Sequence, residues 1–71
     1  MRAPDMYNHL RAAVEQVRVN DKGHFTIAEL KSAVPELLEY ERRNIIEALQ
    51  GLSRELRIEE ASVRGEMWNF I

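Results

Sequence analysis

The sequence predicts a mainly α domain with a small β-hairpin, an α+β fold of three helices. Apolar residues recur at helical spacing through most of the chain up to residue 55. A Thr-x-x-Glu capping box marks one helix start within that region. After residue 56 the apolar residues change to a spacing of two, which is typical of strands.

Composition limits the class of protein. A chain of 71 residues holds one domain (residues 1–71) with a small core, so a homodimer is expected, through the surface of the first helix and the termini. The chain has no cysteine, which suits a reducing cytoplasm and excludes disulfides. No apolar run is long enough to span a bilayer, so we expect a cytoplasmic protein with no membrane partner.

The residues that carry most enzyme chemistry do not occur in the required patterns. His9 and His24 are the only histidines, and their spacing fits no metal motif. There is no Gly-rich phosphate loop and no nucleophile with a matching base. We therefore expect no catalytic residues, no metal and no cofactor, and we do not expect an enzyme.

The first helix is predicted over about residues 5–19. Asp5 is a candidate N-cap with Pro4 outside the helix, and the turn 20–23 ends it. One apolar stripe supports this helix: Met6, Leu10, Ala13, Val14 and Val17.

The second helix is predicted over about residues 27–34. Thr26 and Glu29 form its capping box, and Phe25 can pack onto its first turns. Pro35 disfavours helical backbone in the residue before it and so ends the helix.

The third helix is predicted over about residues 38–55. Its buried stripe is Leu38, Ile45, Leu49, Leu52 and Leu56, with Ile46 alongside. The opposite face holds Tyr40, Arg43, Glu47, Gly51 and Arg54, with Asn44 and Gln50 at its margins. Arg42 lies toward the edge of the stripe, where its stem packs on apolar surface and its charged end reaches solvent.

A β-hairpin is predicted over about residues 56–71. Trp68 and Phe70 alternate with polar or exposed positions and are expected to face the helices. The bend falls either at Ala61 and Ser62 or at Arg64 and Gly65. The predicted core of the domain is Leu10, Val14, Val17, Phe25, Ile27, Leu30, Val34, Ile45, Leu49, Leu52, Ile58, Trp68 and Phe70.

This order of elements resembles the winged helix-turn-helix family over almost the whole chain. The segment "FTIAELKSAV" looks like its second helix, "YERRNIIEALQGLSRE" like its recognition helix and "LRIEEASVRGEMWNFI" like its wing. The resemblance implies a protein that binds double-stranded DNA, with the third helix in the major groove and the wing on phosphates or in the minor groove. It implies these DNA-binding residues: Tyr40, Arg42, Arg43, Asn44, Arg57 and Arg64.

Charge leaves a second function open. The chain has a net charge of −2, and residues 35–55 hold five glutamates against three arginines. Glu39 and Glu47 lie four residues on either side of Arg43 and can pair with it. The first hypothesis is a small DNA-binding protein, a transcriptional regulator or a phage or plasmid accessory factor. The alternative is an acidic winged-helix module that binds a protein partner without binding DNA.

Overall fold

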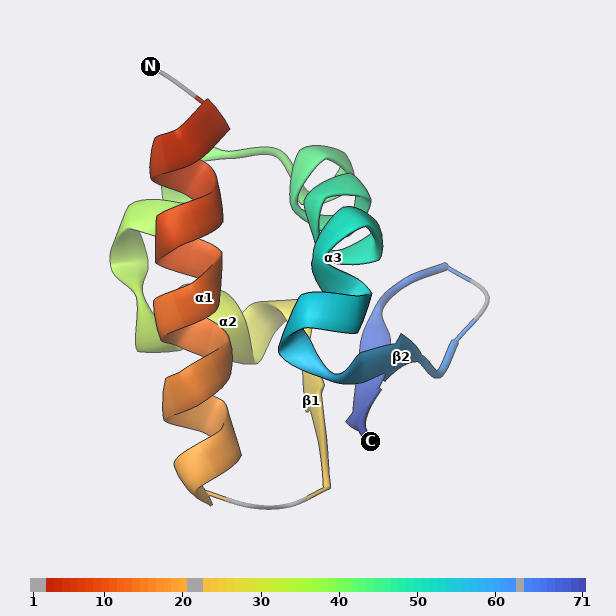
Figure 1. The fold of residues 1–71 in the computed structure, drawn as a ribbon. Coiled ribbons are helices and arrows are strands. Elements are labelled where there is room, and N and C mark those ends of the chain that lie inside the picture. The colour runs from red at the N-terminus through yellow and green to blue at the C-terminus, as the bar shows by residue number, and fades with distance from the viewer. Residues whose placement is uncertain (1–2, 21–22, 63) are drawn as a thin grey trace.

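The computed structural model describes residues 3–20, 23–62 and 64–71 (Figure 1). The elements follow in the order α1 (Ala3–Asn20), β1 (His24–Thr26), α2 (Ile27–Ala33), η1 (Pro35–Glu39), α3 (Arg42–Leu56), β2 (Ile58–Glu60) and β3 (Met67–Phe70). The predicted fold class is confirmed: three α-helices precede a hairpin, in a winged-helix-like α+β arrangement.

The first helix begins earlier than predicted. Because α1 starts at Ala3, Asp5 lies in its first turn and not at the N-cap. The helix ends at Asn20, one residue beyond the prediction. Residues 21 and 22 of the predicted turn lie outside the described residues, and Gly23 after them has a φ of +83°.

The capping box of the second helix is confirmed. The backbone N–H of Glu29 donates to the Thr26 hydroxyl (3.2 Å), and the backbone N–H of Thr26 donates to the Glu29 carboxylate (2.9 Å). The helix ends at Ala33, and the backbone of Val34 is extended, as expected for a residue before proline. Phe25 is fully buried in β1, directly before the cap.

The prediction for the start of the third helix was wrong. Pro35–Glu39 form the separate 3₁₀ helix η1, and extended backbone at Tyr40 and Glu41 separates it from α3. The change of helix type moves the buried position by one residue, so Leu37 is fully buried and Leu38 is 67% exposed. From Ile45 onward the predicted stripe is confirmed, with Ile45, Leu49 and Leu52 buried.

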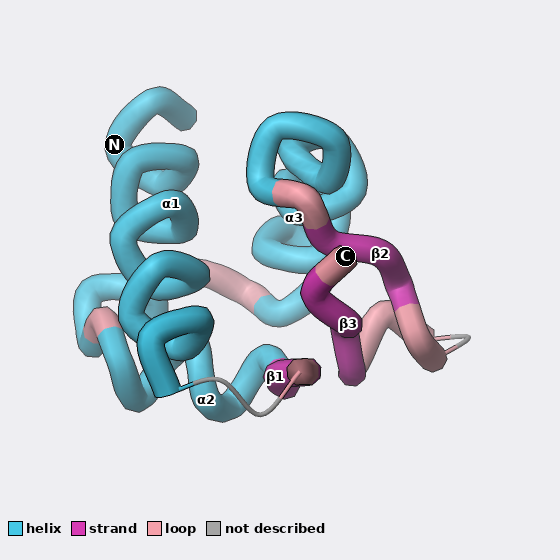
Figure 2. The backbone as a smooth tube through the Cα atoms, turned by 60° about the horizontal axis from the view of Figure 1, so that its bottom comes forward, coloured by secondary structure: helices cyan, strands magenta, loops and turns pink. Residues whose placement is uncertain are grey.

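The strands form one antiparallel sheet in the order β1-β3-β2 (Figure 2). The predicted hairpin is confirmed, with Ile58 opposite Phe70. The strand β1, directly before α2, pairs with the other edge of β3, and Phe25 lies opposite Trp68. The last strand in the chain is therefore the central strand of the sheet.

All but one of the predicted core residues are buried. Phe70 is the exception, because it is partly exposed and packs on the edge of the core. The ring centroids of Phe70 and Phe25 lie 5.2 Å apart. The Arg18 guanidinium lies over the Phe70 ring, 4.6 Å from the ring centroid. The core also contains Ala13, Leu37 and Ala48, which the prediction had left out. None of the helices in the described part of the chain is long and apolar enough to cross a membrane.

Candidate nucleic-acid interface

A groove of about 520 Å³ lies between the N-terminal half of α3 and the loop that joins β2 to β3. We call this loop, residues 61–66, the wing loop. It protrudes beside α3, away from α1 (Figure 1). The groove is lined by Glu41, Arg42, Arg43, Ile46, Glu47, Gln50 and Arg64. Three of the predicted DNA-binding residues thus line one groove: Arg42 and Arg43 on α3, and Arg64 on the wing loop.

The first turn of α3 places two arginines and an amide side chain at the surface. Arg42, Arg43 and Asn44 are its first residues, and all three are exposed. Positive charges at a helix N-terminus oppose the helix dipole, so these arginines do not stabilise α3. Asn44 is exposed but does not line the groove, because it lies about 100° around the helix from Arg43.

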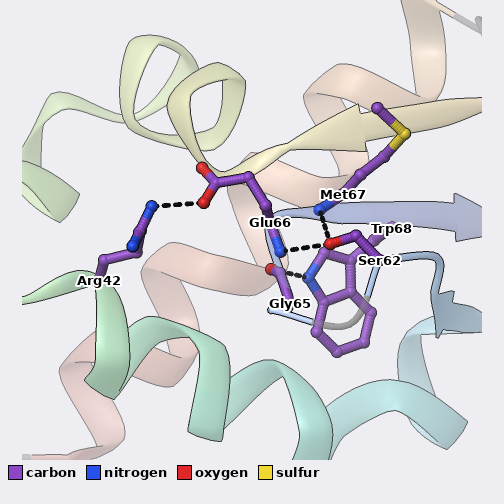
Figure 3. Close-up of polar contacts among 6 residues, drawn as sticks. All are labelled: Arg42, Ser62, Gly65, Glu66, Met67 and Trp68. Carbon is purple, nitrogen blue, oxygen red and sulfur yellow. Dashed lines mark hydrogen bonds and ion pairs between the residues drawn. The ribbon is translucent and has the colours of Figure 1, made fainter.

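The described residues of the wing loop, 61–62 and 64–66, are joined by hydrogen bonds between their own polar groups (Figure 3). The backbone N–H of Gly65 donates to the carbonyl of Ser62 (3.1 Å), which closes a tight turn. The Ser62 hydroxyl oxygen accepts from the backbone N–H of Glu66 (3.0 Å) and of Met67 (3.3 Å). This turn contains Arg64 and Gly65, the second predicted position of the bend. Of the first predicted position only Ser62 belongs to it, because the backbone N–H of Ala61 still donates to the carbonyl of Met67 (2.8 Å) across the hairpin.

Three contacts attach the wing loop and the hairpin to α3. Arg42 forms an ion pair with Glu66, and the side chains point toward each other in Figure 3. About two turns further along α3, the Gln50 amide donates to the Glu60 carboxylate (3.3 Å). Between them Gly65 is buried against Ile46, so closely that a Cβ on the glycine would lie 2.6 Å from the Ile46 Cγ2. The groove therefore has two walls that are fixed relative to each other.

The arginines of the groove differ in what they offer to a ligand. Arg42 is paired with Glu66, and the two side chains are about half exposed. Arg43 and Arg64 are exposed and form no ion pair or hydrogen bond with any residue that the structure describes. The expected pairs of Arg43 with Glu39 and Glu47 are absent from the described residues, and Glu39 lies in η1, outside α3. Two guanidinium groups, one on each wall, are open to an anion.

Two of the predicted DNA-binding residues, Tyr40 and Arg57, do not line this groove. Tyr40 was expected on the outer face of the third helix, but it ends η1, is half-buried against the core and has a buried hydroxyl. Arg57 was expected on the wing, but it ends α3 in left-handed backbone, φ +58°. It lies about 21 Å along the helix axis from Arg43.

Arg57 lines a second groove, of about 310 Å³, between α1 and the C-terminal end of α3. Arg11 and Glu55 form a bidentate pair there, with 2.6 Å between Arg11 Nε and Glu55 Oε2. The hydrogen bond from Arg11 lowers the pKa of the Glu55 carboxyl, and the same bond raises the pKa of Arg11. Arg18 donates to the carbonyl of Leu56 at the end of α3. The arginines of α1 thus hold the end of α3 in place.

Sequence reasoning missed Glu66, Glu60 and the close contact of Gly65 with Ile46. Gly65 has a φ of +72°, and a glycine in a turn is a local signal for such backbone. Glu66 lies 24 residues from Arg42, and no spacing rule joins residues that far apart.

Within the described ranges, no cluster of three or more His, Cys, Asp or Glu residues could hold a metal ion. Comparisons of the chain with family models, with curated proteins and with solved structures found no match.

Proposed function

We propose that this domain is a winged-helix protein that binds double-stranded DNA, with α3 in the major groove and the wing loop beside it. The observation that carries the proposal is the pair Arg43 and Arg64, one from α3 and one from the wing loop. They line the same groove and have no partner among the described residues. Two separated guanidinium groups on rigid elements can bind phosphates or guanine edges.

The net charge of α3 itself favours DNA binding more than the net charge of the predicted segment 35–55 did. Of the five glutamates in residues 35–55, Glu36 and Glu39 lie in η1 and Glu41 precedes the helix. Residues 42–56 hold three arginines and two glutamates, a net charge of +1. One of the two glutamates, Glu55, is paired with Arg11. The outward face of α3 is therefore slightly basic in a protein whose net charge is −2.

The few exposed cations set the expected mode of binding. Nonspecific affinity grows with the number of phosphates that a protein neutralises, and this groove offers only a few arginines. We therefore expect weak nonspecific binding and a larger share of specificity from base contacts of Arg43 and Asn44. A small regulator of transcription or an accessory factor of a phage or plasmid fits this description, in the cytoplasm as first expected.

The test is selection of duplexes from a random pool, followed by titration at low and moderate salt. Arg43→Gln should weaken binding of the selected duplex by about 1 to 3 kcal/mol and relax its sequence preference. Arg64→Gln should weaken the binding of all duplexes by a similar factor. It should also lower the slope of log affinity against log salt concentration by about 1. Arg57→Gln is the matched control, because it removes the same charge at the far end of α3, and it should bind like the parent protein.

Failure of the parent protein to enrich or bind any duplex at low salt would refute the DNA proposal. The alternative is a module that binds a basic protein surface, and the carboxylates of Glu41 and Glu47 in the same groove favour it.

We also propose a homodimer, supported by the small core and by exposed apolar side chains at the predicted surface. Tyr7 on α1 is 36% exposed and Ile71 is 77% exposed. A monomer mass by light scattering at high concentration would contradict the dimer.

A further inference from the structure

The helix α3 contains a glycine, Gly51, in its interior and on its exposed face. Glycine weakens a helix interior more than any residue except proline, because the backbone loses the most freedom on folding and gains no side-chain contact. Two reasons commonly place a glycine inside a structure: a positive φ, or a neighbour that leaves no room for a Cβ.

Neither reason applies to Gly51. Of the glycines that the structure describes, Gly23 and Gly65 have positive φ and Gly51 does not. A Cβ built on Gly51 would meet no described heavy atom within 4 Å, whereas one built on Gly65 would clash with Ile46. The fold of the described chain would therefore accept alanine at position 51 and would gain stability from it.

Gly51 does not line the groove, but it lies on the outward face of α3 next to the groove residues Arg43, Glu47 and Gln50. At 100° per residue, Arg43, Glu47, Gly51 and Arg54 fall within an arc of about 80° on the side opposite the core. All four are exposed. The missing side chain leaves the helix backbone bare at this point, with Glu47 one turn before it and Arg54 one turn after it.

We propose that the backbone of α3 at Gly51 makes the closest contact with the bound duplex, an inference that rests on the proposed DNA-binding function. Arg43 and Arg54 on the same arc attract an anionic partner. Glu47 between them would be repelled by a row of phosphates, but it can accept a hydrogen bond from the amino group of cytosine. The bare backbone therefore faces base edges in the major groove, where a side chain at position 51 would hold the helix away.

The test measures stability and binding in the same variants, Gly51→Ala and Gly51→Leu. Alanine and leucine favour helix more than glycine, so both should raise Tm, by about 4 to 8 °C for Gly51→Ala. Binding of the duplex selected by the parent protein should weaken about tenfold for Gly51→Ala, as for the loss of one good base contact, and more for the larger Gly51→Leu. Ser32→Ala on the exposed face of α2 is the control: it should raise Tm slightly and leave Kd unchanged.

The outcomes separate this inference from the function it rests on. If the parent protein binds a duplex and both variants bind it equally well, the close contact at Gly51 is refuted and DNA binding stands. If Gly51→Ala lowers Tm, the fold itself needs the glycine and the inference is refuted as well. If the parent protein binds no duplex, both the function and the inference are refuted.

Discussion

The indole N–H of Trp68 donates a hydrogen bond of 2.8 Å to the carbonyl oxygen of Gly65. Trp68 is 1% exposed and belongs to the core, whereas Gly65 belongs to the wing loop. One side chain therefore fills the space between the helices and the sheet and also fixes the wing loop beside α3 (Figure 3).

Trp68→Phe should reveal both roles. Phenylalanine keeps most of the apolar volume but leaves the Gly65 carbonyl without its donor, which should lower the free energy of unfolding by about 1 to 3 kcal/mol. Trp68→Ala also leaves a cavity and should cost about 3 to 5 kcal/mol. Urea unfolding followed by circular dichroism measures both values. Equal stability of Trp68→Phe and the parent protein would show that the hydrogen bond contributes nothing.

Gly65→Ala should destabilise the domain by about 2 to 4 kcal/mol, through left-handed backbone and a clash with Ile46. The contact with Ile46 can be isolated by a double-mutant cycle. Ile46→Ala removes Cγ2 and Cδ1, two of the three atoms nearest to a Cβ at position 65, and leaves the Glu60 Oε2 atom at 3.1 Å. Gly65→Ala should cost less in the Ile46→Ala background than in the parent protein. Strictly additive effects would contradict the packing of the wing loop on α3.

The neighbouring leucines of η1 provide a matched pair. Leu37→Ala should cost about 2 to 5 kcal/mol because Leu37 is fully buried. Leu38→Ala should change stability by less than about 0.5 kcal/mol because that side chain is mostly exposed. Thermal or urea unfolding of the two variants compares them directly. A larger loss of stability for Leu38→Ala than for Leu37→Ala would instead support the predicted single helix that starts at residue 38.

The ion pair of Arg11 and Glu55 should make the free energy of unfolding depend on pH in the acidic range. The pKa of Glu55 is lower in the folded protein than in the unfolded chain, so the folded state binds fewer protons. Its contribution is therefore complete above about pH 4.3, the ordinary pKa of a glutamate, and is lost as the pH falls through the lower folded pKa. Glu55→Gln should remove this part of the pH dependence, and Glu59→Gln, at an exposed residue of β2, should leave it. An NMR titration that gives Glu55 an ordinary pKa would contradict the pair.

Local signals in the sequence predicted most of the helices and the hairpin. The capping box of Thr26 and Glu29 acts over three residues, and both its hydrogen bonds form as expected. The 3₁₀ helix escaped prediction because Leu37 and Leu38 are adjacent, and a helical period tells them apart only if the helix type is known.

The candidate interface was predictable only in part. Arg43, Asn44 and Arg64 lie exposed on α3 and on the wing loop, as predicted. The predicted positions of Tyr40 and Arg57 were wrong, because each residue lies at the C-terminal end of a helix, where the backbone direction changes. The pairing of Arg42 with Glu66 depends on how the hairpin packs on α3, and that packing has no counterpart in local spacing.

The central position of β3 in the sheet determines when the domain can fold during its synthesis. Both outer strands hydrogen-bond to β3 and not to each other, and β3 is translated after both of them. Until residues 67–70 leave the ribosome, β1 and β2 have no strand to pair with, and the core lacks Trp68. The helices can form earlier, but the nascent chain completes its cooperative structure only after the whole domain has emerged.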